Sequence, residues 1–328
     1  MANADITVLM PAFNRERFVD EAIESVVAQD FASFELLIVD DGSTDRTPDI
    51  LREWAQRDPR IVVVTAPQNE GIPKALNRGL RAARAPYVAR LDSDDRMLPG
   101  RLAAQAAILD AHADVVLVSC AYDLIDVDGN YLDRWAGGEP HEVAAFFLNF
   151  YNIVGGGGQV MFRREDVLAE GGYAEAYAGS EDYDLWVRML RRGRFVSLPI
   201  VGMQQRQHDA RSDVKYGPAK RYNWTAIMGG ALTRSLGRTI STDEINALIT
   251  LWRHDGALGM SARAHKITRE AFERFCREHN DADLRDQVRR RIALQWRHAA
   301  ASFTRRNERI EALKYRLRAF QWSPFGLR

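Results

Sequence analysis

Residues 87–96 read Tyr-Val-Ala-Arg-Leu-Asp-Ser-Asp-Asp-Arg, so an apolar run is followed at once by three carboxylates within four residues. The run predicts a buried strand, with Asp92, Asp94 and Asp95 at its C-terminal end. Carboxylate oxygens suit Mg²⁺ or Mn²⁺, which usually keep water and substrate phosphate oxygens as their remaining ligands. An isolated cluster of this kind is more often a helix cap or an Asx turn, so the choice depends on the rest of the chain.

A strand, a polar loop and a helix follow one another four times in the first part of the chain. Continuous apolar runs that alternate with helical patterns indicate a parallel sheet covered by helices on both faces. Ligands of such sheets bind beyond the carboxyl ends of the strands. The loops should therefore converge on one rim, which favours a functional site over a simple cap. The strands are expected at 6–10, 34–39, 61–65 and 87–91, and the loops at 11–15, 40–45, 69–71 and 92–95.

The composition is that of an ordinary globular protein, with 46% hydrophobic and 27% charged residues in a chain of 328. Cys120 and Cys276 lack metal-ligand spacing, which favours a reducing compartment without disulfides. The first residues lack the basic segment of a signal peptide, and no apolar run approaches the roughly 20 residues of a membrane span. We expect a cytoplasmic protein, peripheral to the inner face of the membrane if its tail binds lipid.

Five short motifs, each weak alone, occur together in one order. They are Pro-Ala-Phe-Asn (11–14), Val-Asp-Asp-Gly-Ser-Thr-Asp (39–45), Asn-Glu-Gly (69–71), Leu-Asp-Ser-Asp-Asp (91–95) and Ser-Glu-Asp-Tyr-Asp-Leu-Trp (180–186). In this order and spacing the chain resembles the family-two glycosyltransferases, inverting nucleotide-sugar enzymes of the GT-A fold. The resemblance implies an α/β fold with a GT-A-type, Rossmann-like sheet, mostly parallel and flanked by helices. Phe13 stands where the family often has Tyr, so a hydroxyl contact is lost there.

On the donor side, the resemblance implies that Asp41 accepts the imide N–H of uracil or thymine and that Asp92 faces the ribose. Asp94 would hold Mn²⁺ or Mg²⁺ on the diphosphate, with Asp95 as its support or as a simple helix cap. Lys74 is the candidate for a basic residue near the donor, and a plain solvent-facing lysine is the alternative. The nucleoside would be framed by Pro11, Ala12, Phe13 and Asn14.

On the acceptor side, Ser180 precedes an acidic pair typical of a helix N-terminus, where the helix dipole alone could account for both acids. The resemblance assigns the base that deprotonates the acceptor hydroxyl to Asp182, with Glu181 beside it at the substrate. Trp186 is a candidate platform for the acceptor, although a core aromatic is the role we favour. His208, after a strand expected at 200–205, would complete the metal site, although a lone His is more often a core or surface residue.

The pattern changes to helices alone after residue 215, so we expect a glycosyltransferase domain at 1–215 and a C-terminal helical appendage at 216–328. Within the appendage, Ser241 and Glu244 have the capping-box spacing of a helix start. The four glycines at 155–158 suit either a mobile loop over the sugar or acceptor or a tight connection without a ligand.

The end of the chain is basic. Residues 285–328 hold twelve Arg or Lys and three acids, a net charge of +9 that leaves −9 on residues 1–284. Aromatic residues are interleaved with the basic ones, which suits an anionic membrane surface. Either the tail meets such a surface or a partner, or its apolar stripe packs on the appendage and leaves the arginines as a solvated face. Nucleic acid is not expected as a partner, because the body is acidic. The stripe consists of Ile310, Leu313, Leu317 and Phe320.

We therefore expect a metal-dependent, inverting glycosyltransferase that moves a sugar from a nucleoside-diphosphate sugar to a hydroxyl of a glycan or lipid-linked saccharide, with UDP as the favoured nucleotide. One alternative is a nucleotidyltransferase, but residues 11–17 lack the glycines of a triphosphate loop. Another is an inactive nucleotide- or carbohydrate-binding module, against which Asp94, Asp182 and His208 all count.

Overall fold

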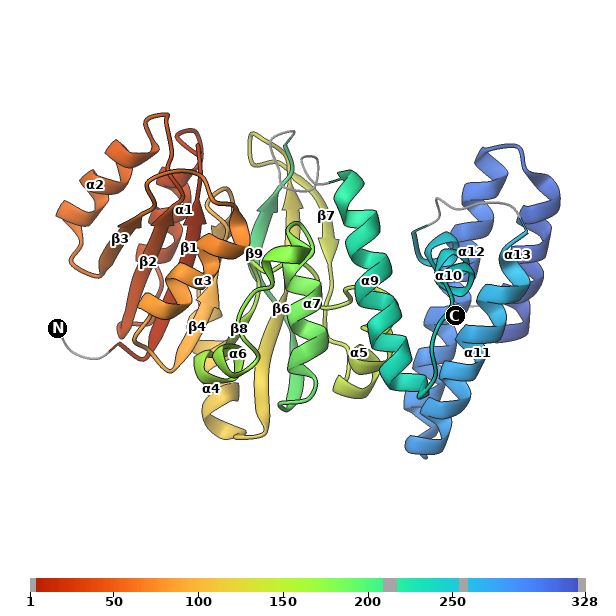
Figure 1. Cartoon of the computed structure of the whole chain (residues 1–328). Coiled ribbons are helices and arrows are strands. Elements are labelled where there is room, and N and C mark those ends of the chain that lie inside the picture. The colour runs from red at the N-terminus through yellow and green to blue at the C-terminus, as the bar shows by residue number, and fades with distance from the viewer. Residues whose placement is uncertain (1–3, 209–216, 254–258, 324–328) are drawn as a thin grey trace. The chain divides into compact units, whose positions relative to one another are not determined.

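The protein, for which we obtained a computed structural model, is described at residues 4–208, 217–253 and 259–323 (Figure 1). It divides into two compact units, Met1–His141 with Val154–Lys220 and Glu142–Ile153 with Arg221–Arg328. The boundary expected at residue 216 lies outside the described residues. The segment Glu142–Ile153, which we placed in the first domain, instead groups with the C-terminal helices.

Four parallel strands open the first unit, in the spatial order β3-β2-β1-β4, and all four match the expected apolar runs. β1 is fully buried from Ile6 to Met10, as a strand covered on both faces must be. The strands are β1 (Ile6–Ala12), β2 (Phe34–Asp40), β3 (Ile61–Thr65) and β4 (Tyr87–Arg90), and the helices that connect them are α1 (Val19–Val27), α2 (Thr47–Arg57) and α3 (Ile72–Ala82).

Beyond β4 the sheet is mixed rather than parallel. β8 is antiparallel to both β4 and β6, whereas β6 and β9 run parallel. β9 begins at Arg194 instead of residue 200, and the short strand β5 does not correspond to any apolar run in the sequence. The elements are β5 (Arg96–Met97), α4 (Arg101–Ala111), β6 (Val115–Ile125), β7 (Tyr131–Trp135), β8 (Met161–Arg163), α6 (Arg164–Ala169), a 3-10 helix (Glu175–Tyr177), α7 (Glu181–Met189) and β9 (Arg194–Arg206).

In its described residues the second unit contains helices with the turns and loops that connect them, and no strand. The ring of Trp252 lies 5.0 Å from that of Phe150 and 5.3 Å from that of Tyr151, measured between centroids. This aromatic cluster explains why the segment after α5 joins the later helices. No described helix combines the length and the apolar character needed to cross a membrane. The helices are α5 (His141–Phe147), α9 (Gly217–Leu236), α10 (Thr242–Arg253), α11 (Ser261–Glu278), α12 (Ala282–Arg305) and α13 (Arg309–Trp322).

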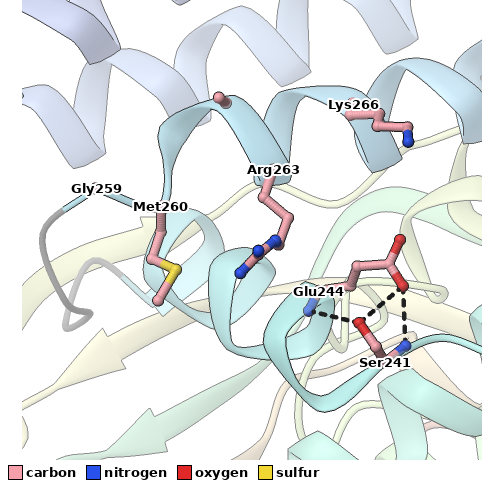
Figure 2. Close-up of a pocket in the computed structure, with 7 residues that line it drawn as sticks. Ser241, Glu244, Gly259, Met260, Arg263 and Lys266 are labelled. Carbon is pink, nitrogen blue, oxygen red and sulfur yellow. Dashed lines mark hydrogen bonds between the residues drawn. The ribbon is translucent and has the colours of Figure 1, made fainter.

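α10 begins with the expected capping box, which Figure 2 shows at the edge of a pocket. The Ser241 N–H donates to Glu244 Oε2 at 2.9 Å, and the Glu244 N–H donates to Ser241 Oγ at 3.3 Å. Arg238 donates to Glu244 Oε1 at 2.9 Å and also pairs with Glu270 at 2.7 Å. The hydrogen bonds from Arg238 lower the pKa of Glu244 to about 2. Both a cap and an ion pair therefore hold the start of α10.

Glu244→Gln should separate these two contributions, because Gln can still complete a capping box but carries no charge. We expect the free energy of unfolding to fall by about 1 kcal/mol at neutral pH, the upper end for a partly exposed ion pair. A carboxylate whose pKa is lowered by folding stabilises the protein above its unfolded pKa. The difference from wild type should therefore vanish as the pH falls from about 4.5 to about 2.

Urea unfolding at several pH values provides the measurement, and Ser241→Ala is the matched control. That variant loses the Oγ cap and the hydrogen bond from Ser241 Oγ to Glu244 Oε2 but keeps the ion pair. Its deficit of roughly 0.5–2 kcal/mol should depend less on pH than that of Glu244→Gln, because Arg238 makes the larger contribution to the lowered pKa of Glu244. Parallel pH curves for Glu244→Gln and wild type would contradict the role of the charge.

Candidate active site

The loop after β1 is tied to the loop after β2. Asn14 adopts a left-handed conformation with φ of 50°, which Asn tolerates better than most residues. Its N–H donates to Ser43 Oγ at 3.0 Å, and its Oδ1 accepts the Thr44 N–H at 2.8 Å. Of the residues expected to frame the nucleoside, Ala12 is buried, Pro11 and Phe13 are partly exposed, and Asn14 is exposed. Two of the predicted rim loops thus meet.

Asp41 joins the loop after β2 to the one after β3. Its carboxylate is 4% exposed and accepts the N–H groups of Glu70 at 3.0 Å and Gly71 at 2.8 Å. Burial raises the pKa of Asp41, and these two donors partly offset that effect. Gly42 allows the close approach: its φ is +73°, and a Cβ there would lie 2.5 Å from the Gln68 carbonyl carbon.

Asp94, in the loop after β4, contacts both the loop after β1 and the residues that follow β9. Asp94 Oδ2 lies 3.1 Å from Arg15 Nε and 3.0 Å from His208 Nε2. The structure therefore brings together the two side chains proposed as metal ligands. Carboxylate and imidazole are suitable donors for Mn²⁺ or Mg²⁺. Within the described ranges no group of three or more His, Cys, Asp and Glu is close enough to hold a metal, so water and phosphate oxygens would supply the other positions.

Phe18 and Arg206 hold His208 and Asp95 in place. The His208 ring centroid is 5.0 Å from that of Phe18, and the Arg206 guanidinium lies over the same ring at 5.1 Å. Arg206, 2% exposed, donates from Nε to the Asp94 carbonyl at 3.1 Å. Asp95, 3% exposed, accepts the Arg206 N–H at 2.9 Å. Asp95 thus ties the loop after β4 to the end of β9.

The acidic pair begins α7, as the sequence predicted. Glu181 is buried, and its Oε2 accepts the Gly179 N–H at 2.7 Å. Asp182 is half-buried, with Oδ1 accepting the Tyr183 N–H at 2.7 Å. Trp186 is fully buried, and its ring centroid lies 6.2 Å from that of Phe162. Trp186 therefore occupies the core in this structure and presents no ring face to an acceptor.

Lys74 lies in the first turn of α3 and its side chain is 45% exposed. Its Nζ is 3.9 Å from Glu175 Oε2 in the 3-10 helix that precedes α7. This weak surface pair points Lys74 toward the segment that leads to the acidic pair.

Comparison with known proteins shows the family of this chain. Residues 7–170 match the family model described as glycosyl transferase family 2. This chain belongs to glycosyltransferase family 2. The amylovoran biosynthesis glycosyltransferase AmsE of Erwinia amylovora is 31% identical over 230 residues, which cover 67% of this chain and 81% of AmsE. In one curated relative, however, the match covers only 23% of that protein's own length.

Two solved structures show that the family 2 chain has a GT-A-like fold. Staphylococcus aureus TarS 1–349 in complex with UDP-GlcNAc matches with a TM-score of 0.58 and 16% identity, over 98% of this chain and 92% of TarS 1–349. The mannosyltransferase PcManGT of Pyrobaculum calidifontis, in complex with GDP-Man and Mn²⁺, matches with a TM-score of 0.55 and 18% identity, over 99% and 88%. Membership of family 2 also counts against the alternative of a nucleotidyltransferase.

Arg90 lies beside the acidic loop after β4, and the sequence analysis did not single it out. It is 4% exposed at the end of β4, and its Nη2 donates to Asp92 Oδ1 at 3.0 Å. Burial would lower the pKa of Arg90, but Asp92, Tyr173, Glu181 and Asp182 together raise it. One buried cation thus interacts with carboxylates of the loop after β4 and of α7. An Arg within the apolar run 87–91 was the available signal, because buried strands rarely keep an Arg without a charged partner.

The four glycines lie beside these charges. A Cβ on Gly157 would overlap Arg90 Nη1, and one on Gly158 would come 3.4 Å from Asp95 Oδ2. Gly157 therefore permits a backbone approach to the buried guanidinium that no other residue allows. Arg90 Nε and Nη1 are buried and have no hydrogen-bond partner among the described residues. Such unpaired groups cost stability and tend to be retained where function requires them.

Asp41→Asn should destabilise the glycosyltransferase unit. Asp41 accepts one backbone N–H with each oxygen, whereas the amide NH₂ of Asn would face one of these donors and leave it unpaired. We expect the free energy of unfolding to fall by about 1–3 kcal/mol in urea titrations. Asp49→Asn is the control, because Asp49 is 60% exposed in a surface pair with Arg52, and its effect should stay within about 0.5 kcal/mol. Equal stability of both variants would contradict this account of Asp41.

Proposed function

We propose that this glycosyltransferase moves a sugar from UDP to a hydroxyl of a glycan or lipid-linked saccharide, with inversion at the anomeric carbon and with Mn²⁺ or Mg²⁺. The observation that carries the proposal is the meeting of Arg15 and His208 on one oxygen of Asp94. Three segments far apart in the sequence thereby place a carboxylate, an imidazole and a guanidinium around one point. That combination suits a divalent ion together with a diphosphate.

On the donor side, we assign the nucleoside to the loop formed by Pro11, Ala12, Phe13 and Asn14, with Asp41 accepting from the base. TarS with UDP-GlcNAc and PcManGT with GDP-Man and Mn²⁺ support a nucleotide-sugar donor and a metal. Asp92 would contact the ribose with one carboxylate oxygen, while Arg90 donates to the other oxygen of Asp92, Oδ1. A divalent ion held by Asp94 would compete with Arg15 for this carboxylate, so Arg15 would be available to bind the diphosphate. We also propose Lys74 as the basic residue near the donor.

On the acceptor side, we assign to Asp182 the role of the base that removes the proton from the attacking hydroxyl. Inversion requires the base on the face of the sugar opposite the leaving group. The hydrogen bond from the Gly179 N–H to Glu181 fixes the turn before α7, so that the following residue is held in place. A divalent ion held by Asp94 and His208 would neutralise the negative charge that develops on the diphosphate. The name of AmsE, a biosynthetic enzyme for amylovoran, supports a saccharide acceptor.

The two cysteines support a cytoplasmic location. Cys120 is buried and both cysteines are free, which fits a reducing compartment.

A thermal-shift panel tests the donor and the metal together. A ligand that binds only the native state raises the melting temperature by mass action. We expect the largest rise with UDP and Mn²⁺ together, and smaller rises with UDP alone or with GDP or TDP. A preference for GDP would reassign the base, and no rise with any nucleotide would overturn the proposed donor.

Asp182→Asn should lower the turnover number roughly 10²-fold or more while donor binding stays intact, because Asn can accept the Tyr183 N–H but cannot take a proton. The measurement is the transfer rate at saturating donor, with nucleotide affinity by calorimetry. Glu181→Gln is the matched control, since Gln retains an acceptor for the Gly179 N–H, and it should cost less. Near-normal transfer by Asp182→Asn with an inactive Glu181→Gln would move the base to Glu181.

Chelation with EDTA should abolish transfer, and Asp94→Ala should remove the Mn²⁺-dependent part of nucleotide binding. His208→Ala should weaken that binding less, because the carboxylate carries the charge that a hard cation prefers. His112, exposed at the end of α4, provides the control, and His112→Ala should leave nucleotide binding unchanged. Full activity in excess EDTA would contradict a metal-dependent reaction.

A further inference from the structure

Helix α13 has two apolar faces on opposite sides. One face is buried against α11 and α12: Tyr315 lies 5.0 Å from Trp296 and Trp322 lies 5.3 Å from Phe272, between ring centroids. At about 100° per residue, the expected stripe falls on the side away from these contacts. Its four side chains are all exposed, Ile310 by 75%, Leu313 by 57%, Leu317 by 58% and Phe320 by 61%.

The exposure of the stripe counts against one of its two expected uses, packing on the appendage. The helical unit already covers the opposite face of α13 through Ala312, Tyr315, Ala319 and Trp322. Among the described residues, the appendage therefore does not cover the stripe. Four of the eight large apolar side chains that are exposed in the described residues lie on this one helix face. A contiguous apolar patch of this kind marks an interaction surface more often than scattered single residues do.

Basic residues border the stripe on both sides. Arg309 and Arg316 follow one edge at helical spacing, and Lys314 and Arg318 follow the other. Lys314 pairs with Glu311, whereas Arg316 donates to Thr304 and Arg318 to Gln321. Glu311 is the acid of α13 and is only 7% exposed, so the outer side of the helix presents positive charge without negative charge.

We propose that this face of α13 docks on an anionic lipid surface. The docking face consists of Ile310, Leu313, Leu317 and Phe320 with Arg309, Lys314, Arg316 and Arg318. In such a complex the apolar stripe enters the boundary between headgroups and acyl chains while the flanking cations meet lipid phosphates. Charge complementarity selects this occupant over a second copy of the chain, because two such faces would bring rows of like charge together. The proposal goes beyond sugar transfer and does not depend on it.

The test is flotation of the full-length protein with vesicles of phosphatidylglycerol and phosphatidylcholine, compared with vesicles of phosphatidylcholine alone. We expect binding to the anionic vesicles only, and its loss in about 0.5 M salt, which screens surface charge. The combined variant Leu313→Ser, Leu317→Ser and Phe320→Ser should lower the partition coefficient at least tenfold. Because these side chains are exposed, the variant should keep the wild-type melting temperature.

Two further variants complete the experiment. Replacing Arg309, Lys314, Arg316 and Arg318 by Gln should lower binding to anionic vesicles as strongly as the apolar variant does. The control Tyr131→Ser with Leu132→Ser removes equally exposed apolar side chains from β7, at 59% and 54% exposure, and should bind like wild type.

Three outcomes would overturn the proposal. The first is equal flotation with neutral and anionic vesicles, and the second is undiminished binding by the apolar variant. The third is an absence of flotation together with self-association of the wild type in sedimentation experiments that the apolar variant abolishes, which would make a second copy the occupant. Donor binding, measured in parallel without lipid, should be the same in all variants, so a failure here is distinct from a failure of the proposed enzyme function.

Discussion

Three carboxylates within four residues repel one another unless each has a positive partner or a donor, and this constraint shapes the catalytic unit. Arg90 of β4 pairs with Asp92, and the Arg206 N–H of β9 donates to Asp95. Asp94 has both Arg15 and His208. Arg15 and the β9-end residues Arg206 and His208 lie far from the acidic stretch in the sequence, so their contacts join the loop after β1 and the end of β9 to the loop after β4. The parallel strands place these loops at one edge of the sheet, and the charge pairs hold them together there.

The same charges link the loop after β4 to the start of α7. The buried Arg90 guanidinium interacts electrostatically with Asp92 and also with Glu181 and Asp182. One cation thus attracts carboxylates of both segments. Gly157 lets the backbone lie against this cation, which gives the glycine run a packing role in addition to any role in a moving loop.

The helical unit is stabilised by different interactions. Its interior depends on aromatic side chains, among them Trp252 against Phe150 and Tyr151, and Trp296 against Tyr315. Its local stability depends on features such as the capping box at Ser241. The outer face of α13 differs from this interior, because its large apolar side chains are exposed to water beside basic ones. A soluble helix gains nothing from that arrangement unless another surface covers it.

The sequence by itself determined the local elements and their chemistry. Apolar runs revealed the four parallel strands, and because strand ends share an edge, the loops carrying Asp41 and Asp94 could be placed at one rim. The role of Asp182 came instead from the resemblance to family 2 and stays a proposal. The start of α10 and the stripe of α13 also followed from spacing alone. Periodicity reports which face of an element a residue occupies, and these features need no further information.

Only the tertiary structure decided what covers each face. It put Trp186 in the core, gave Asp94 two partners, grouped residues 142–153 with the later helices and left the α13 stripe exposed. It also inserted β8 antiparallel between β4 and β6. All of these depend on contacts between residues far apart in the chain, and such contacts leave no local pattern. The role of Arg90 lies between the two, since its charge within an apolar run was visible but its partners were not.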